Sequence, residues 1–373
     1  MKKNKDNKKI NILLITDDVL QLSTAPSSRL FRLGQIFSEQ GFGVSLMPLH
    51  NKLPLGLRSF SRKSSYLRRI YLTIKMFFDI KSSKFNAVLV RGVYIGVAAL
   101  FISKFFRKSL YYDFHGLCWK EEEHKGNTLK SILFRVLEYI LLSYSTIILA
   151  QTKSNKFVAH SYNNNSLFLG NGINVKDFID EKDLNILEKY KIPSNLNLIG
   201  FIGNWENWMN VEDLLKSSEY ISDSKVIIVG EGKGIEDYRK HYSEVIFTGR
   251  IPHRDAIQIL HHLDVCISPH SDDIIMKYKS AVKTLEYMAA GKPMIISDVV
   301  GKEDFLEEFK NCLFYEPNNP KDLASKVMCI IKDKNLLTSM SKVNKVLSQD
   351  FSWENVVKNS GIINELNKFD NQT

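Results

Sequence analysis

Short apolar runs alternate with longer segments of helical period along most of the 373-residue chain. Residues 28–40, for example, have the helical pattern, and they follow Pro26 and end before Gly41. Strands separated by helices in this way favour parallel sheets of the doubly wound type. Two series of strands are predicted, one over residues 10–15, 43–47, 87–90, 110–113, 146–149 and 167–169, and one over residues 198–202, 225–229, 245–247, 265–268, 294–296 and 312–315.

Two such series predict two domains, and the chain is also longer than a single core usually supports. The break between them falls in the polar stretch 175–197, where Pro193 precedes the first strand of the second series. We therefore expect a first domain over residues 1–180 and a second over residues 181–350. Residues 351–373 are expected to form a last helix, with Ser352 as its N-cap.

The composition, 44% hydrophobic and 25% charged, is typical of a globular protein. The longest apolar runs are too short to span a bilayer, and the lysine-rich start leads into a brief strand without a signal-peptide cleavage pattern. The four cysteines are far apart, which predicts neither a zinc site nor a disulfide framework and fits a reducing cytoplasm. They are Cys118, Cys266, Cys312 and Cys329.

The positive net charge of +10 is concentrated between Asn51 and Lys84, where nine basic residues stand against the single acid Asp79. Aromatic and aliphatic residues lie between these charges, and a smaller cluster of the same kind follows at residues 104–108. Such a mixture is suited to an anionic membrane surface. A solvated helix face over an ordinary core is the alternative. Nucleic acid is not expected, because no binding signature for it accompanies the charges.

Residues 280–293 predict a helix that opens at Ser280 and closes at Gly291, with Pro293 preventing its continuation. Lys283 and Glu286 lie three residues apart, so they share a face near the helix start. A helix N-terminus with an ammonium group beside it favours phosphate, and a carboxylate one turn later can accept two ribose hydroxyls. These groups could bind a nucleoside diphosphate, although a Lys–Glu pair on a helix surface is also common.

The loops after the strands offer further candidates, since ligands of paired doubly wound domains bind at the carboxyl ends of the strands in the interdomain cleft. His115 could contact a sugar or phosphate or act as a general base, unless it only caps or packs. Gly203, which precedes Asn204, permits a close approach of backbone to ligand, although residues 203–208 could also be an aromatic-lined loop without function. Arg250 and Ile251 follow a strand whose end could meet a base edge. The glycine-rich residues 230–234 lack the spacing of a phosphate loop and could be a tight turn.

Taken in order, these segments resemble the GT-B-fold nucleotide-sugar glycosyltransferases of bacterial polysaccharide assembly, commonly placed in family four. The most specific part is residues 283–293, Lys-Thr-Leu-Glu-Tyr-Met-Ala-Ala-Gly-Lys-Pro. The resemblance covers most of the chain and implies two Rossmann-like domains that face a cleft. The other matching segments are residues 203–204, 229–232, 247–249 and 263–269, and, in the first half, residues 10–16, 113–116 and 171–173 followed by Phe178.

The chain departs from this family's pattern at three places. Retaining members carry two glutamates eight positions apart; the second matches Glu286, but Tyr278 stands where the first would be. The usual Arg and Lys after the first strand of the second domain are missing, since Asn204, Trp208 and Met209 occupy that region. Residues 24–28 replace a double-glycine loop. Lys283 is therefore the main cation expected at the diphosphate, and retention or inversion of the anomeric configuration stays open.

The resemblance implies transfer of a sugar from a nucleotide-diphosphate sugar to a glycan or lipid-linked acceptor in cell-surface polysaccharide synthesis. His115 would contact the transferred sugar or its phosphate, Glu286 the ribose, and residues 248–251 the base. No metal or other cofactor is expected. The protein would lie at the cytoplasmic face of the cell membrane as a peripheral protein. Two alternatives are a nucleotide-sugar epimerase on the same fold and a non-catalytic partner subunit.

Overall fold

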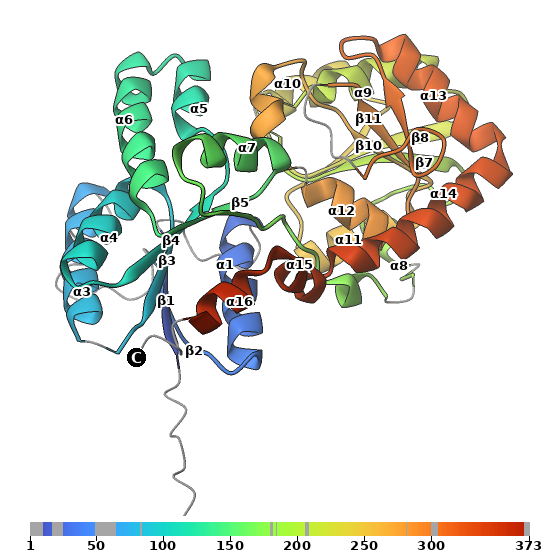
Figure 1. The fold of residues 1–373 in the computed structure, drawn as a ribbon. Coiled ribbons are helices and arrows are strands. Elements are labelled where there is room, and N and C mark those ends of the chain that lie inside the picture. Colours follow the sequence, from blue (N-terminus) through green and yellow to red (C-terminus); the bar gives the residue numbers. More distant parts are fainter. Residues whose placement is uncertain are drawn as a thin grey trace, which may run out of the picture. The chain divides into compact units, whose positions relative to one another are not determined.

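The computed structural model describes residues 10–16, 25–48, 65–82, 84–179, 182–183, 185–205, 209–280, 282–299 and 305–368 (Figure 1). The chain forms two compact units. Unit 1 comprises Met1–Asn171 and Trp353–Thr373, and unit 2 comprises Gly172–Ser352. The first break thus lies before the boundary at residues 180/181 expected from the sequence, and the C-terminal residues return to unit 1.

Unit 1 is built on a six-stranded, entirely parallel sheet with the order β2-β1-β3-β4-β5-β6. Its four inner strands are largely apolar and buried, since helices cover both faces, whereas the two edge strands are partly exposed. The strands are β1 (Asn11–Thr16), β2 (Gly43–Pro48), β3 (Ala87–Arg91), β4 (Ser109–Phe114), β5 (Ile147–Ala150) and β6 (Ser166–Phe168).

The helices of unit 1 form two layers. On one face α1 (Ala25–Glu39), α15 (Trp353–Ser360) and α16 (Ile362–Asn367) share a core with alternate strand residues. On the other face α4 (Val93–Phe105) packs on β3 and β4 and contacts its neighbouring helices. Those neighbours are α3 (Ser65–Lys81) and α6 (Thr128–Tyr144), and the described part of the unit also contains α5 (Cys118–His124) and α7 (Lys153–Tyr162).

Unit 2 contains a second six-stranded parallel sheet with the order β12-β11-β10-β7-β8-β9. This is the order 3-2-1-4-5-6 of a dinucleotide-binding sheet, counted from the strand β9 toward β12. Its strands are β7 (Asn197–Ile202), β8 (Ser224–Val229), β9 (Ile246–Gly249), β10 (Val265–Ser268), β11 (Met294–Ser297) and β12 (Cys312–Tyr315).

Two core clusters fill the space on either side of this sheet. One joins alternate strand residues to α8 (Asn185–Lys189), α11 (His253–His262) and α12 (Val282–Ala289). The other joins the remaining strand residues to α9 (Val211–Ser217) and α13 (Pro320–Lys332). The unit also contains α10 (Ile235–His241), α14 (Lys334–Leu347) and the 3-10 turns η1 (Val175–Phe178), η2 (Ser218–Tyr220), η3 (Ile274–Tyr278) and η4 (Ser348–Phe351).

The predicted doubly wound architecture is confirmed, and each of the twelve predicted apolar runs overlaps a strand. Helix α12 is described from Val282 onward, and residue 281 lies outside the described residues, so the predicted role of Ser280 at the helix start stays a prediction. Of the predicted membrane-binding stretch, residues 51–64 lie outside the described residues, and the following residues begin α3. None of the described helices is both long enough and apolar enough to cross a bilayer.

Candidate functional site

The strand order of unit 2 reverses between β7 and β10. From β7 the chain continues to β8 and β9 on one side, whereas β10 leads to β11 and β12 on the other. In open parallel sheets, ligands bind at the carboxyl ends of the strands at such a reversal. The residues that follow these two strands are Gly203 and Asn204 after β7, and Pro269 and His270 after β10.

The loops after β7, β8 and β9 approach one another through backbone atoms. The N–H of Gly203 donates to the Val229 carbonyl at 2.8 Å, and the N–H of Gly230 donates to the Gly249 carbonyl at 3.0 Å. A Cβ on Gly230 would lie 2.4 Å from the Gly203 carbonyl oxygen, so a side chain there would collide with backbone. Gly203 and Gly230 also have φ values of 129° and 127°, which L-residues rarely adopt. The glycines therefore permit this close junction.

Lys283 lies across the same junction. Its Nζ is 5.4 Å from the centroid of the Phe201 ring and 3.6 Å from the sulfur of Met209. A Cβ on Gly203 would lie only 2.3 Å from the Lys283 Cε, so the glycine leaves the space that the lysine stem occupies. An ammonium group in the first turn of α12 is thereby held at the carboxyl end of β7.

Tyr287 connects α12 to the two strands at the reversal. Its buried hydroxyl accepts a hydrogen bond from the Ile202 N–H at 3.1 Å and donates to the Ile267 carbonyl at 3.3 Å. Ile202 ends β7, and Ile267 lies in β10. Because a buried hydroxyl with two hydrogen-bond partners is costly to displace, Tyr287 fixes the position of α12 and therefore of Lys283 on the same helix.

We expect Gly203→Ala to weaken nucleoside-diphosphate binding about tenfold or more, since Lys283 must leave its place, and to lower the free energy of unfolding by about 1–3 kcal/mol, since φ is positive. Calorimetric titration and urea unfolding measure the two effects. Gly41→Ala is the matched control, because Gly41 has a φ of 91° but no atom within 4 Å of the place that a Cβ would take. Unchanged nucleotide affinity in Gly203→Ala would show that Gly203 does not contribute to nucleotide binding.

Glu231 joins two of the predicted donor-binding residues. Its N–H donates to the Asn204 side-chain oxygen at 3.3 Å, and its carboxylate accepts from the Arg250 N–H at 3.4 Å. The Trp205 N–H donates to the Glu231 carbonyl at 3.1 Å. Ile251, the next residue after Arg250, packs against the core of the unit. Asn204, Arg250 and Ile251 thus lie on connected loops at the carboxyl edge of the sheet, as the sequence predicts.

Glu286 is placed one turn after Lys283 on α12 and is partly buried. Burial raises the pKa of Glu286 above its ordinary value, and the positive charges of His253 and Lys283 oppose this shift. When it is ionised, a carboxylate at this position can accept hydrogen bonds from a polyol such as ribose, and the ammonium group of Lys283 favours that form.

The loop after β10 is anchored by a chain of buried hydrogen bonds that the sequence does not reveal. The His270 N–H donates to the Ser297 hydroxyl at 2.6 Å, which donates to the Tyr315 hydroxyl at 3.1 Å. Tyr315 donates to Asp213 at 3.1 Å. Burial, together with the charge of Lys283, lowers the pKa of His270 to about 3, so its ring is neutral at physiological pH. These hydrogen bonds fix the backbone at His270, in the loop that leads to Lys283.

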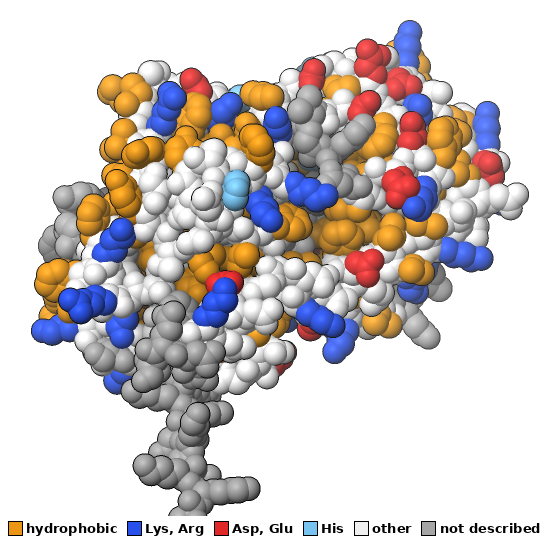
Figure 2. Space-filling model, in the orientation of Figure 1, with side chains coloured by type: hydrophobic (Ala, Val, Ile, Leu, Met, Phe, Trp, Pro, Cys, Tyr) orange, Lys and Arg blue, Asp and Glu red, His pale blue; other side chains and the backbone are white. Residues whose placement is uncertain are grey.

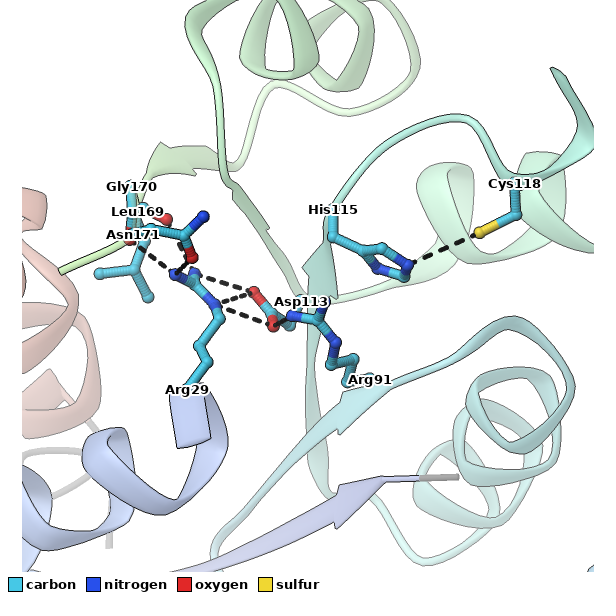
Figure 3. Close-up of polar contacts among 8 residues, drawn as sticks. All are labelled: Arg29, Arg91, Asp113, His115, Cys118, Leu169, Gly170 and Asn171. Atoms are coloured by element: carbon cyan, nitrogen blue, oxygen red, sulfur yellow. Dashed lines mark hydrogen bonds and ion pairs between the residues drawn. The ribbon is translucent and has the colours of Figure 1, made fainter. Parts of the chain in front are cut away.

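In unit 1, Asp113 near the end of β4 is buried between two arginines (Figure 3). Arg29 from α1 and Arg91 from β3 lie 3.0 Å and 2.9 Å from its carboxylate oxygens. Arg29 also donates to the carbonyls of Leu169 at 2.8 Å and Gly170 at 2.6 Å. Burial alone would raise the pKa of Asp113, but the two guanidinium groups lower it overall. This cluster joins α1, β3, β4 and the segment after β6.

His115 follows β4 and precedes Gly116, whose φ is 139°. Its Nε2 lies 3.8 Å from the Cys118 sulfur, as Figure 3 shows. The Cys118 N–H, at the start of α5, donates to Glu138 of α6 at 2.9 Å. Burial raises the pKa of Glu138 to about 7, although the hydrogen bonds from Cys118 and Trp119 oppose the shift. The turn that carries His115 is therefore held by a carboxyl group that titrates near neutral pH.

We expect Glu138→Gln to stabilise the protein at pH 8 by about 2–3 kcal/mol, because glutamine keeps the acceptor oxygen and removes a buried charge. Native Glu138 keeps its proton between pH 4.5 and about 7 in the folded state but loses it when unfolded. The free energy of unfolding should thus fall as pH rises through this window, and less so in the variant. Urea unfolding at several pH values tests this, with exposed Glu123→Gln as control. Identical pH profiles for the native chain and Glu138→Gln would contradict it.

The structure brings Gly203, Asn204, Arg250 and Ile251 together with Lys283 at one edge of the unit 2 sheet, and Glu286 follows on α12. His115 belongs to unit 1, and the expectation that it meets the donor stays a prediction. Within the parts of the chain that the structure describes, no group of three or more His, Cys, Asp or Glu side chains is arranged to hold a metal ion.

The family model described as "Glycosyl transferases group 1" matches residues 197–333, which lie in unit 2. An uncharacterized glycosyltransferase of Methanocaldococcus jannaschii is 23% identical over 236 residues, and the match spans 62% of this chain and 62% of that relative. The similarity to this curated relative therefore covers less than two thirds of its length.

Solved glycosyltransferase structures have the same fold over nearly the whole chain. HepE of Anabaena, solved in complex with UDP-glucose, superposes with a TM-score of 0.69 at 13% identity and covers 95% of this chain and 99% of its own. WaaG, a glycosyltransferase involved in lipopolysaccharide biosynthesis, gives a TM-score of 0.69 at 13% identity with the same coverage. The sheet orders and these superpositions thus show the GT-B fold of two Rossmann-like units, and the second unit resembles the group 1 glycosyl transferases over residues 197–333.

Proposed function

We propose that the chain transfers a sugar from a nucleotide-diphosphate sugar to a glycan or lipid-linked acceptor in cell-surface polysaccharide biosynthesis. The observation that carries the donor part is the position of Lys283, whose ammonium group lies in the first turn of α12 at the strand-order reversal. This is where a parallel sheet of this order receives a nucleotide. The UDP-glucose complex of HepE, which has the same fold, supports a nucleotide sugar as the donor.

The proposed chemistry follows from the charge that develops on the leaving group. When the glycosidic bond breaks, the bonding electrons remain with the diphosphate, whose negative charge rises. Lys283 and the N–H groups at the start of α12 would stabilise that charge, because they are already oriented before reaction. Glu286 would hold the ribose hydroxyls, and the segment that contains Arg250 and Ile251 would meet the base. His115 keeps the proposed role of contacting the transferred sugar or its phosphate.

The proposal includes no metal or other cofactor, because Lys283 and the helix N-terminus supply the positive charge that the diphosphate needs. The acceptor is proposed to be membrane-associated, and the protein to act as a peripheral protein at the cytoplasmic face of the membrane. Support comes from the basic and aromatic residues of unit 1 and from WaaG, which has the same fold and is involved in lipopolysaccharide biosynthesis. Nucleic acid is not among the proposed partners.

The experiment is to incubate the purified chain with UDP-, GDP- and ADP-sugars, with and without a glycolipid extract and with and without EDTA. We expect nucleoside diphosphate release that depends on the acceptor and persists in EDTA. A sugar isomer formed without acceptor would instead identify an epimerase. No turnover with any donor and acceptor would leave only a non-catalytic partner subunit and overturn the proposal.

A further inference from the structure

Helix α6 of unit 1 buries Phe134, Leu141 and Leu142 but also exposes a second set of apolar side chains. Leu129 is 86% exposed and Ile132 is 59% exposed, whereas Ser131 and Glu138 are buried. Most of the exposed residues lie three or four positions apart, which places them on one side of the helix. They are Leu129, Ile132, Leu133, Val136, Tyr139 and Tyr144. An outward apolar stripe of this length is unusual on a surface that meets only water.

The stripe continues onto two neighbouring helices. Helix α4 packs against α6, with Gly96 facing Leu141, and α3 packs against α4 with the rings of Phe77 and Phe106 5.2 Å apart. The exposed apolar side chains of α4 and α3 are Phe101, Phe105, Ile74, Phe77 and Phe78. Figure 2 shows hydrophobic and basic side chains intermixed over the part of unit 1 where Figure 1 labels α3, α4, α5 and α6. We name this surface the α3/α4/α6 face.

Basic residues surround these apolar side chains. Those exposed on the three helices or directly after α4 are Lys75, Lys81, Lys104, Arg107, Lys130 and Arg135. Among the described side chains of the three helices, the acids are Asp79, 3.8 Å from Lys75, and the buried Glu138. On the adjacent α5, Glu122 pairs with Lys130 at 2.9 Å, and Glu123 is exposed. The charge of the α3/α4/α6 face is therefore strongly positive.

We propose that the α3/α4/α6 face docks on the surface of a bilayer that contains anionic phospholipid. The apolar side chains would enter the boundary between headgroups and acyl chains, and the lysines and arginines would lie at the headgroup phosphates. A second copy of the chain fits this face poorly, because two identical positive faces would repel each other. The inference deepens the proposed function, on whose membrane-associated acceptor it rests. It also places the docking surface largely on α4 and α6 rather than on residues 51–64.

The cations and the aromatic rings support one another within this face. The Lys104 ammonium lies 4.8 Å from the centroid of the Tyr144 ring, and the Arg135 guanidinium lies 5.0 Å from that of Trp119. Such pairs keep a cation and an amphipathic ring at the same level, which is where both occur at a membrane–water interface. The contacts join α4 to α6 and α6 to α5.

The test is co-sedimentation of the full chain with vesicles of phosphatidylcholine alone or with added phosphatidylglycerol. The native chain should bind the anionic vesicles, and binding should weaken as salt screens the charges. Leu129→Ser, Ile132→Ser and Val136→Ser together should lower vesicle binding about tenfold or more at low salt and at high salt alike. Lys104→Gln with Arg135→Gln should remove mainly the salt-sensitive part, by about tenfold. Val346→Ser with Tyr220→Ser, which changes exposed apolar residues of unit 2, is the control and should bind as the native chain does.

Vesicle binding tests the docking face, and nucleotide binding tests the proposed function, so the two can fail independently. UDP affinity, measured by calorimetry, should be equal in all variants, so a native chain that binds vesicles but no nucleotide would overturn the proposed function alone. Vesicle binding by the triple serine variant equal to that of the native chain would overturn the docking face. So would a native dimer that the serine variant converts to monomer without any change in vesicle binding.

Discussion

Lys283→Ala is expected to lower the turnover of the nucleotide-sugar donor about 100-fold or more, the usual cost of removing an oriented group that stabilises transition-state charge. Lys283 is suited to this role because Gly203 makes room for its stem and Tyr287 fixes its helix on β7 and β10. Its loss also removes a charge-assisted contact to the bound diphosphate. Steady-state measurement of nucleoside diphosphate release gives kcat and KM for both chains.

The control for this prediction is Lys332→Ala, which removes an exposed lysine at the end of α13 and should leave turnover unchanged. Lys283→Ala should keep the native far-ultraviolet circular dichroism and unfolding midpoint to within a small shift, since its charge is not part of the core. A folded Lys283→Ala chain with native kcat/KM would remove Lys283 from the mechanism.

Arg29→Met is expected to lower the free energy of unfolding of unit 1 by about 3–5 kcal/mol, because it leaves the buried Asp113 short of one partner. The carbonyls of Leu169 and Gly170 would lose their donor as well. Hydrogen exchange measured on peptides from α1 and β4 would report the loss within unit 1 itself. Because the pKa of Asp113 is lowered in the folded state, the stability that it contributes is present above about pH 4 and is lost in acid.

Arg135→Met is the matched control for this variant. Arg135 is an exposed arginine of the same unit, with its guanidinium 5.0 Å from the Trp119 ring, so its replacement should cost about 1 kcal/mol or less. Equal exchange protection in Arg29→Met and in the native chain would show that the cluster around Asp113 adds nothing to stability.

The sequence predicts the strands of this fold because most of them are buried on both faces of their sheet. Each strand then appears as a continuous apolar run between amphipathic segments, and these runs predict all twelve strands. Helix starts are less sharply predicted, since several residues near a helix start can satisfy the N-cap preference and the first turn often varies by one or two residues.

The sequence predicts the donor site as separate motifs but not the contacts among them. Gly203 stands out as a glycine after a strand, but its approach to the Lys283 stem depends on the packing of α12 across β7. The sequence does not predict the roles of His270 and Tyr287, because both roles depend on hydrogen bonds to residues far away along the chain. Asp113 is noticeable in the sequence as an aspartate at the end of an apolar run. Its partner Arg29 lies 84 positions away, and no nearby residue indicates that the two form an ion pair.

The α3/α4/α6 face shows a second limit of prediction from the sequence. A helical period identifies an apolar stripe on residues 128–144, but the period alone does not tell which side of the helix meets the core. Only the structure shows that Ser131 and Glu138 face inward while Leu129 and Ile132 face outward. The prediction of a basic membrane-binding segment at residues 51–84 therefore does not include α6.

The most direct test of the donor site is to titrate nucleoside diphosphates and monophosphates of uridine, guanosine and adenosine into the native chain and into Lys283→Ala. Lys283 is proposed to face the diphosphate, so the native chain should bind one diphosphate about tenfold or more tightly than the matching monophosphate. Lys283→Ala should lose this preference while keeping the monophosphate affinity. Equal preference in both chains, or no nucleotide binding by the native chain, would contradict the proposed donor site.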